Sequence, residues 1–221
     1  MSASDTSSRA AGPPPSAPPA KRGRGRPRHE QPSEAYLAKQ AEIIDVAIEV
    51  FGERGFEQGT LDDVAASLGT GRASLYHYVP SKAHLLYLIF DRAISMTLDT
   101  MGHLAAIADP GERLRALIRQ QVHTIAANPG MFIVFFGDRP ALDERYEAEI
   151  RLKERRLLRY LIEAVKAASD AGEIGSLEPR LAAQALLGMT SWFHKWYDPA
   201  RDDPDAFADV CVHLVFPARS C

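Results

Sequence analysis

Arginine side chains near the N-terminus are the first residues whose type and spacing could do chemistry. Residues 21–30 read KRGRGRPRHE and place Arg24, Arg26 and Arg28 at alternate positions. Guanidinium groups bind phosphates, and the Gly and Pro residues between them leave nothing apolar to bury. The stretch therefore predicts a flexible cationic tail.

Two interpretations of this basic stretch remain open from its residues alone. The core RGRP (24–27) looks like an AT-hook, in which an extended Arg-Gly-Arg lies along the narrow minor groove of A·T-rich DNA. The other interpretation is a solvated basic linker. The choice between them depends on the kind of domain that the rest of the chain forms.

Catalytic and metal-binding patterns are absent from the sequence. It contains no Gly-rich phosphate loop, no Ser/His/Asp set and no cluster of metal ligands. His77 and His84 are seven residues apart and lie on either side of an expected helix break, so they do not form a metal pair. We expect no enzyme activity, no metal and no cofactor.

Charge and composition limit the class of protein. The 221 residues carry a net charge of -3, yet residues 1–30 hold six Lys and Arg against Asp5 and Glu30. A basic arm on an acidic body predicts that polyanion contacts are confined to the N-terminal part. With only Cys211 and Cys221, no secretory signal and no apolar run of membrane-spanning length, we expect a soluble cytoplasmic protein with no membrane contact.

Helical periodicity continues from about residue 36 to the end of the chain and predicts an all-α fold. The first helix is expected over Tyr36–Arg54. A second begins at Thr60, in a variant capping box with Asp63, and ends at Gly69. A third short helix follows, with Leu75 and Val79 facing inward.

Two short helices joined by a Gly-containing turn and braced by a longer helix are typical of a helix-turn-helix. The alternative is a small three-helix bundle with no DNA role. That alternative explains the apolar stripe but leaves Tyr76, His77 and Lys82 as chance surface residues.

Residues 41–86, AEIIDVAIEVFGERGFEQGTLDDVAASLGTGRASLYHYVPSKAHLL, resemble the N-terminal domain of the TetR family of bacterial transcriptional regulators. Two positions depart from the family pattern. Gly71 stands where a Ser or Thr cap is usual, and Val79 stands where Phe is usual. Gly is an acceptable N-cap and Val still fills an apolar site, so the same fold is expected.

The resemblance implies a set of DNA contacts. The second short helix would enter the major groove, where Arg72 would read a guanine, with a phosphate contact as its alternative. Ser74 would reach a base or a phosphate. Backbone contacts carry over to Thr60, Tyr76, His77 and Lys82. Arg24, Arg26 and Arg28 would then extend the footprint of the same domain, as a homeodomain arm does.

The rest of the chain predicts a helical body. Asp109 and Pro110 begin one helix, residues 130–137 form a short buried one, and a long helix is expected from about Pro140 to Ala171. Residues 180–197 are apolar on more than one face, and Asp203 begins the last helix. In TetR-like proteins the last two helices pair with those of a second copy, which implies a homodimer and a palindromic operator.

The segment GMTSWFHKWYDP (188–199) resembles a signature of TetR-type regulators of lipid, fatty-acid and steroid catabolism, several of which respond to acyl-CoA thioesters. The resemblance implies an effector pocket in the helical body. Candidate effector contacts are Phe132, Phe135, Phe136, Arg155, Trp192 and Trp196. The alternative for these aromatic residues is core or dimer packing, and the alternative for the arginine is a solvated surface position.

Together these features predict a tail with a basic arm over residues 1–34, a helix-turn-helix domain over 35–84 and an effector-binding, dimerisation domain over 85–217. The predicted function is a dimeric repressor that a small hydrophobic effector, an acyl-CoA or another lipid, releases from double-stranded operator DNA. The alternative function is an AT-hook architectural protein with a helical oligomerisation body.

Overall fold

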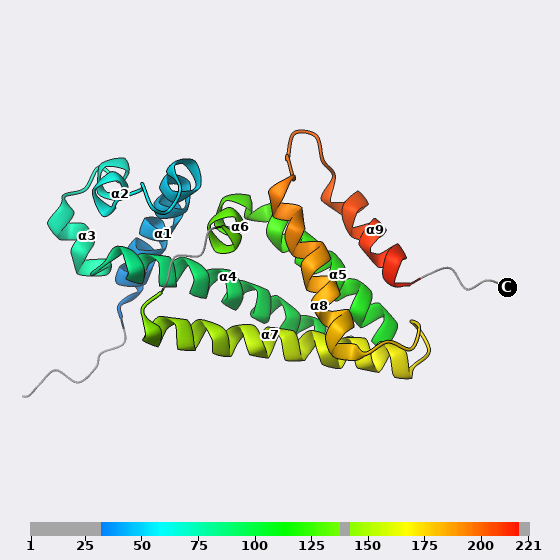
Figure 1. Ribbon diagram of the computed structural model, residues 1–221. Helices are drawn as coiled ribbons and strands as arrows, with labels where there is room; N and C mark the ends of the chain where they lie inside the picture. The colour runs from blue at the N-terminus through cyan, green and yellow to red at the C-terminus, as the bar shows by residue number, and fades with distance from the viewer. Residues whose placement is uncertain (1–31, 138–141, 217–221) are drawn as a thin grey trace, which may run out of the picture. The chain divides into compact units, whose positions relative to one another are not determined.

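A computed structural model describes residues 32–137 and 142–216 of the chain, and the described part is helical with no strand (Figure 1). The predicted all-α class is confirmed. The elements in chain order are α1 (Glu34–Arg54), α2 (Leu61–Ser67), α3 (Arg72–Tyr78), α4 (Lys82–Leu104), α5 (Pro110–Ala127), α6 (Pro129–Phe136), α7 (Glu144–Asp170), α8 (Pro179–Ser191), the 3-10 turn η1 (Trp192–Lys195) and α9 (Pro204–Val215).

Local capping interactions set the ends of α2. The Thr60 hydroxyl accepts from the Asp63 backbone N–H at 3.1 Å, while the Asp63 carboxylate accepts from the Thr60 N–H at 2.9 Å. Both halves of the predicted capping box are therefore formed. Gly69, with a φ of 61°, turns the chain away after α2 in a conformation that other residues rarely adopt.

One apolar core fixes the helix-turn-helix. Residues from α1, α2, α3, α4 and α6 meet in a single buried cluster, and Val79 in the α3–α4 connection is fully buried. Val79 therefore fills the apolar site that the sequence suggested. Representative members, one from each helix, are Ile43, Val64, Leu75, Leu85 and Phe132.

A second core holds the larger helices together. It is formed by α4, α5, α7, α8 and α9, so α4 contributes to both cores. Asp109 caps α5 with Pro110 in its first turn, and Asp203 caps α9 with Pro204 in the same place, as predicted. None of the helices in the described ranges is long and apolar enough to cross a membrane.

Two predicted helix boundaries differ from the structure. The long helix α7 begins at Glu144 after the N-cap Asp143, and Pro140 lies outside the described residues. The segment 180–197 is not one helix, because α8 ends at Ser191 and the chain tightens into η1. Within η1, Phe193 is fully buried and stacks on Phe207 of α9 with ring centroids 4.6 Å apart.

Two glycines of the helix-turn-helix give opposite stability predictions. A Cβ added at buried Gly59 would lie 2.7 Å from Cδ1 of Phe51, a fully packed ring, whereas a Cβ added at Gly52 within α1 meets nothing within 4 Å. We expect Gly59→Ala to lower the free energy of unfolding by about 1–3 kcal/mol through overpacking. Gly52→Ala should raise it by about 0.5–1 kcal/mol, because it restricts the unfolded chain. Urea denaturation measures both, and equal effects of the two variants would contradict the packing described here.

Candidate nucleic-acid interface and effector cavity

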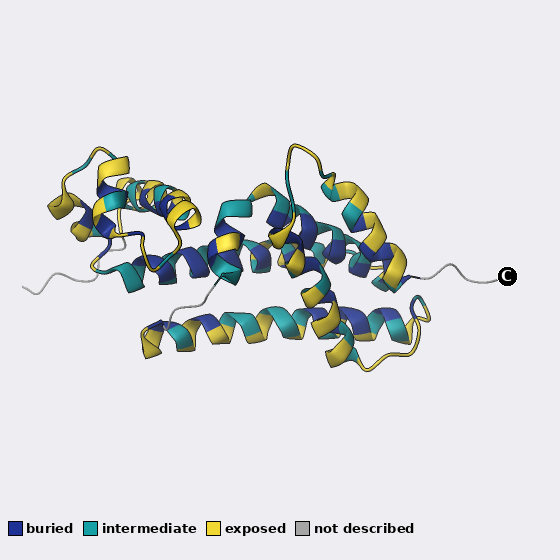
Figure 2. Cartoon of the chain, turned by 45° about the horizontal axis from the view of Figure 1, so that its top comes forward, coloured by how far each residue is buried: buried dark blue, intermediate teal, exposed yellow. Residues whose placement is uncertain are grey.

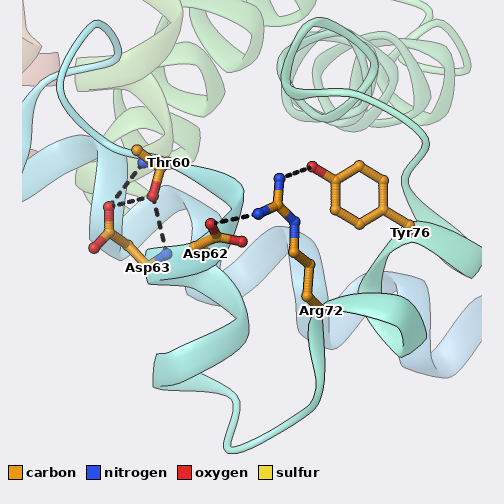
Figure 3. A network of polar contacts seen from close by, with 5 residues as sticks. All are labelled: Thr60, Asp62, Asp63, Arg72 and Tyr76. Atoms are coloured by element: carbon orange, nitrogen blue, oxygen red, sulfur yellow. Dashed lines mark hydrogen bonds and ion pairs between the residues drawn. The ribbon is translucent and has the colours of Figure 1, made fainter.

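Arg72, the first residue of α3, is the centre of an exposed polar network (Figure 3). Its guanidinium donates to the Asp62 carboxylate at 2.9 Å and to the Tyr76 hydroxyl at 3.1 Å. The side chains of Arg72 and Asp62 are 65% and 57% exposed, so this ion pair contributes little stability. Arg72 can therefore exchange Asp62 for a DNA group at small cost.

Hydrogen bonds and opposite charges favour the ionised forms of Arg72 and Asp63. The bond to Tyr76 and the charge of Asp62 raise the pKa of Arg72. The pKa of Asp63 is lowered, first by the bond from the Thr60 hydroxyl, then by the Thr60 backbone N–H and Arg54. Arg54 reaches Asp63 at 2.6 Å, so two arginines neutralise the two carboxylates at the start of α2. Without them, the carboxylates would repel phosphates.

Four of the predicted DNA contacts gather around one surface depression. Thr60, Arg72, Tyr76 and Lys82 all line it, together with Asp62. Three elements bring them there: the residue before α2, the exposed face of α3 and the first turn of α4. Three cation or hydroxyl side chains and a phenol around one concave surface can bind a phosphate backbone.

Thr60 and Lys82 are already engaged within the chain. The Thr60 hydroxyl donates to Asp63 at 2.7 Å, and the Lys82 ammonium donates to the Glu57 carbonyl at 3.1 Å. Lys82 also lies 4.2 Å above the Phe56 ring. These contacts hold both groups at the edge of the depression.

The remaining predicted DNA contacts lie elsewhere. Ser74 and His77 are exposed on α3 but do not line the depression, and His77 packs edge-on against Tyr36 at 5.9 Å. Arg24, Arg26 and Arg28 lie outside the described residues. Asp62 is the residue that the sequence reasoning missed, because the turn between α2 and α3 brings it to Arg72 across ten positions.

A cavity of about 320 Å³ lies among α4, α5, α6, α7 and α8. Its lining is mostly apolar, and three side chains of α6 contribute their rings. A volume near the lower end of the ~300–1,000 Å³ range of ligand pockets suits a small ligand or one end of a larger one. The lining residues are Ala93, Ile94, Thr97, Gln121, Phe132, Phe135, Phe136, Glu154, Leu157, Leu158, Gln184, Leu187 and Ser191.

Three of the six predicted effector residues line this cavity and three do not. Phe132, Phe135 and Phe136 line it, whereas Arg155, Trp192 and Trp196 do not. Arg155 lies on the exposed side of α7, next to Glu154 on the lining side. Trp192 directly follows α8 and is 63% exposed, and Trp196 packs edge-on against the rings of Phe193 and Phe207. Gln121, Glu154 and Gln184 were not predicted, since polar residues on amphipathic helices look solvated in a sequence.

Large apolar side chains remain exposed on the last helices. Exposed residues lie along α9, the helix that leads to the C label in Figure 2. Leu181 and Trp192 near the two ends of α8 and Val210 and Leu214 on α9 are all more than half exposed. Exposed apolar side chains of this size on the last two helices are candidates for an interaction surface.

The two histidines considered in the sequence have structural contacts. His84 lies 2.7 Å through Nδ1 from the Tyr146 hydroxyl of α7, and burial followed by the charge of Arg145 lowers its pKa. His77 packs against the Tyr36 and Tyr78 rings. In the residues that the structure covers, no group of three or more His, Cys, Asp or Glu could hold a metal ion.

Comparison with known proteins identifies both parts of the chain. A family model described as "Bacterial regulatory proteins, tetR family" matches residues 43–87. A second, described as "Tetracyclin repressor-like, C-terminal domain", matches residues 108–218, half of the chain. Helices α2 and α3 lie within the first match, and the cavity-lining residues from Gln121 onward lie within the second.

Similar proteins agree with these matches. The "Uncharacterized HTH-type transcriptional regulator Rv0472c" of Mycobacterium tuberculosis is 26% identical over 199 residues, covering 89% of this chain and 82% of the relative. The "Fatty acid metabolism regulator protein" of Bacillus subtilis is 25% identical over 166 residues, covering 70% and 83%. A crystal structure of AibR in complex with isovaleryl coenzyme A and operator DNA matches with a TM-score of 0.75 and 27% identity, over 81% of this chain and 98% of AibR.

The helix-turn-helix geometry, the two family matches and these relatives lead to one conclusion: the chain belongs to the TetR family of bacterial transcriptional regulators, whose members bind operator DNA and are not enzymes.

Proposed function

We propose that this regulator is a cytoplasmic dimeric repressor that a small hydrophobic effector, an acyl-CoA or another lipid, releases from a palindromic operator. The observation that carries the DNA half of the proposal is the exposed Arg72 at the start of α3, paired with Asp62 and Tyr76. Residues 35–84 would read DNA, and residues 85–217 would bind the effector and the second copy.

DNA binding would rearrange the network around Arg72. A guanine presents O6 and N7 as two acceptors that a guanidinium can bind at once. Arg72 would leave Asp62 for the guanine, while Tyr76 would turn its hydroxyl to a phosphate. Thr60 and Lys82 would contact the backbone from the starts of α2 and α4, where helix dipoles favour anions. Ser74 and His77 would add contacts from the exposed side of α3.

The exposed apolar side chains of α8 and α9 support dimerisation. Trp192, which directly follows α8, and Val210 and Leu214 of α9 are 63%, 55% and 66% exposed. Pairing with the same surface of a second copy would bury them, and a two-fold dimer places two α3 helices against two half-sites.

The cavity and two relatives support the effector class. The relative from Bacillus subtilis is named for fatty acid metabolism, and AibR was crystallised with isovaleryl coenzyme A and operator DNA. The cavity of this chain, with Phe132, Phe135 and Phe136 on its lining, suits the apolar part of such a ligand. Because α4 lines the cavity and also begins with Lys82, a ligand that moves α4 would move the DNA-binding helices.

The role of Arg72 is tested by Arg72→Ala. We expect operator affinity to fall about 10- to 100-fold and discrimination at one base pair to relax, because a bidentate guanine contact is worth about 1–3 kcal/mol. Fluorescence anisotropy with the intergenic DNA upstream of the gene measures both. Arg156→Ala, at an exposed arginine of α7, is the control and should leave affinity unchanged. If Arg72→Ala lowers the affinity for all DNA sequences equally, Arg72 contacts a phosphate instead of a base.

Asp62→Asn is expected to strengthen DNA binding several-fold. The substitution removes a negative charge from the depression and frees Arg72 from its partner at 2.9 Å. Because repulsion from phosphates acts on any sequence, nonspecific DNA should gain as well, and the gain should shrink in high salt. Asp45→Asn, whose carboxylate pairs with Arg92 between α1 and α4, is the matched control. Weaker binding by Asp62→Asn would mean that Asp62 positions Arg72 for reading.

Removing residues 1–30 tests the arm and the repressor function together. If Arg24, Arg26 and Arg28 bind phosphates, the truncated protein should keep its operator preference and lose about 2–3 from the slope of log affinity against log salt concentration. Octanoyl-CoA should release both forms from the operator in the same anisotropy measurement. If the truncated protein loses all sequence preference, the AT-hook architectural function is favoured instead. If no acyl-CoA changes DNA binding, the proposed effector class is contradicted.

A further inference from the structure

Gln121 of α5 lines the cavity, and the oxygen of its side-chain amide has no hydrogen-bond partner. Its side chain is 8% exposed, and its Oε1 atom is buried without a hydrogen bond to any described group. A buried amide oxygen left without a partner costs about 1–3 kcal/mol. Such a group within a ligand-sized cavity indicates that a ligand supplies the missing partner.

The polar groups around Gln121 define what that partner can be. The Thr97 hydroxyl, also on the cavity lining, donates to the Ala93 carbonyl at 2.9 Å and keeps a lone pair free to accept. The amide of Gln121 can present either its oxygen or its NH₂ group, because both orientations fit the same shape. A single uncharged oxygen, a hydroxyl or a carbonyl, can satisfy it.

The charges of the lining disfavour an anion. Among the described residues that line the cavity, Glu154 is acidic and no residue is Lys, Arg or His. Arg151, which interacts electrostatically with Glu154, is exposed and donates through Nε to Glu147 at 3.1 Å. A carboxylate that entered the cavity would therefore lose water without gaining a cation.

The volume limits how much of a ligand can enter. About 320 Å³ corresponds to roughly ten water-sized groups. The rings of Phe132, Phe135 and Phe136 would surround an apolar body of that size. A whole coenzyme A thioester is too large, so only its acyl group and thioester carbonyl would fit.

We propose that Gln121 is the polar recognition group of this cavity and that it hydrogen-bonds an uncharged hydroxyl or carbonyl oxygen on an otherwise apolar ligand of about ten heavy atoms. This inference rests on the proposed effector function and narrows its ligand. Phosphates and free carboxylates stay outside the cavity.

Three eight-carbon probes, matched in chain length, test the inference by isothermal titration calorimetry on the full chain. The probes are 1-octanol, its apolar analogue 1-chlorooctane, and octanoate at pH 7. We expect 1-octanol to bind more tightly than either of the others, with octanoate weakest. The hydrogen bond to Gln121 should make the affinity for 1-octanol about tenfold higher than that for 1-chlorooctane.

Gln121→Leu separates this hydrogen bond from simple packing. The variant should lose the tenfold preference for 1-octanol, keep its affinity for 1-chlorooctane, and unfold at a higher temperature without ligand, because the unpartnered amide is gone. Gln120→Leu, one position earlier on α5, is the matched control. Gln120 donates to Thr124 at 3.2 Å and does not line the cavity, so the preference should persist.

Each other outcome overturns the inference. Equal affinity for 1-octanol and 1-chlorooctane, an unchanged preference in Gln121→Leu, or tighter binding of octanoate would show that Gln121 does not select an uncharged oxygen. Absence of binding by all three probes would show that the cavity does not accept such a ligand. Operator binding, measured separately by anisotropy without any probe, would remain intact in each case, so a failure of this inference is distinguishable from a failure of the proposed DNA function.

Discussion

The buried face of α4 is the constraint on which both halves of the structure depend. Leu85, Leu86, Ile89 and Phe90 are at most 1% exposed and belong to the core that holds the helix-turn-helix. Further along the same helix, α4 lines the cavity, and near its end Met101 joins the second core. Because interiors are close-packed, a shift of α4 at the cavity would be passed along the helix to the core beneath α2 and α3. Under the proposed effector function, this shared helix would link the cavity to the DNA-binding helices.

Polar contacts between α4 and α7 fix how these two packed helices are aligned. Tyr87 stacks on Tyr146 at 4.4 Å and donates to Glu149 at 2.6 Å, and the Lys153 ammonium donates to Asp91 and to Ser95. Burial, followed by the bond to Glu149, raises the pKa of Tyr87, so the phenol keeps its proton. These contacts hold the first half of α4 against α7, and Met101 packs with α7 again in the second core. A ligand in the cavity would therefore act on a pair of helices that is held together on both sides of it.

Local chemistry explains which parts of the fold could be predicted from the sequence. Ser81, Asp109 and Asp203 cap their helices through hydrogen bonds that span two or three residues, so a short window of sequence contains both partners. The apolar stripe of the helix-turn-helix is similarly local. The end of α8 was not predictable in this way. Just beyond it, Phe193 is buried against Phe207, and Phe207 comes only after an intervening turn of the chain.

In the candidate sites, too, the features formed within one helix could be predicted, and those that depend on contacts between helices could not. The exposed side of α3 and the apolar side of α6 were predictable, because each occupies consecutive turns of one helix. The pairing of Arg72 with Asp62 depends on the turn between two helices, and the lining of the cavity depends on how five helices pack. Periodicity assigns Gln121 and Glu154 to a solvated side of their helices. It shows which side of a helix is polar, but it does not show which other helices pack against that side. The tryptophans illustrate the opposite error: large apolar residues suggest a pocket, but Trp192 lies on the outside of η1.

The size of the cavity also limits how the effector could act. To change the ratio of the DNA-binding conformation to the released conformation from 99:1 to 1:99, a ligand must bind the released conformation more tightly by about 5.5 kcal/mol. A ligand of about ten heavy atoms gains at most about 1.5 kcal/mol per atom, and larger ligands gain less per atom. At that ceiling ten atoms gain about 15 kcal/mol, so at least about a third of the binding energy must differ between the two states. Contacts with the rings of α6 and the amide of Gln121 meet this requirement only if the cavity closes in the DNA-bound form, because a cavity open in both forms would bind the ligand equally and shift neither.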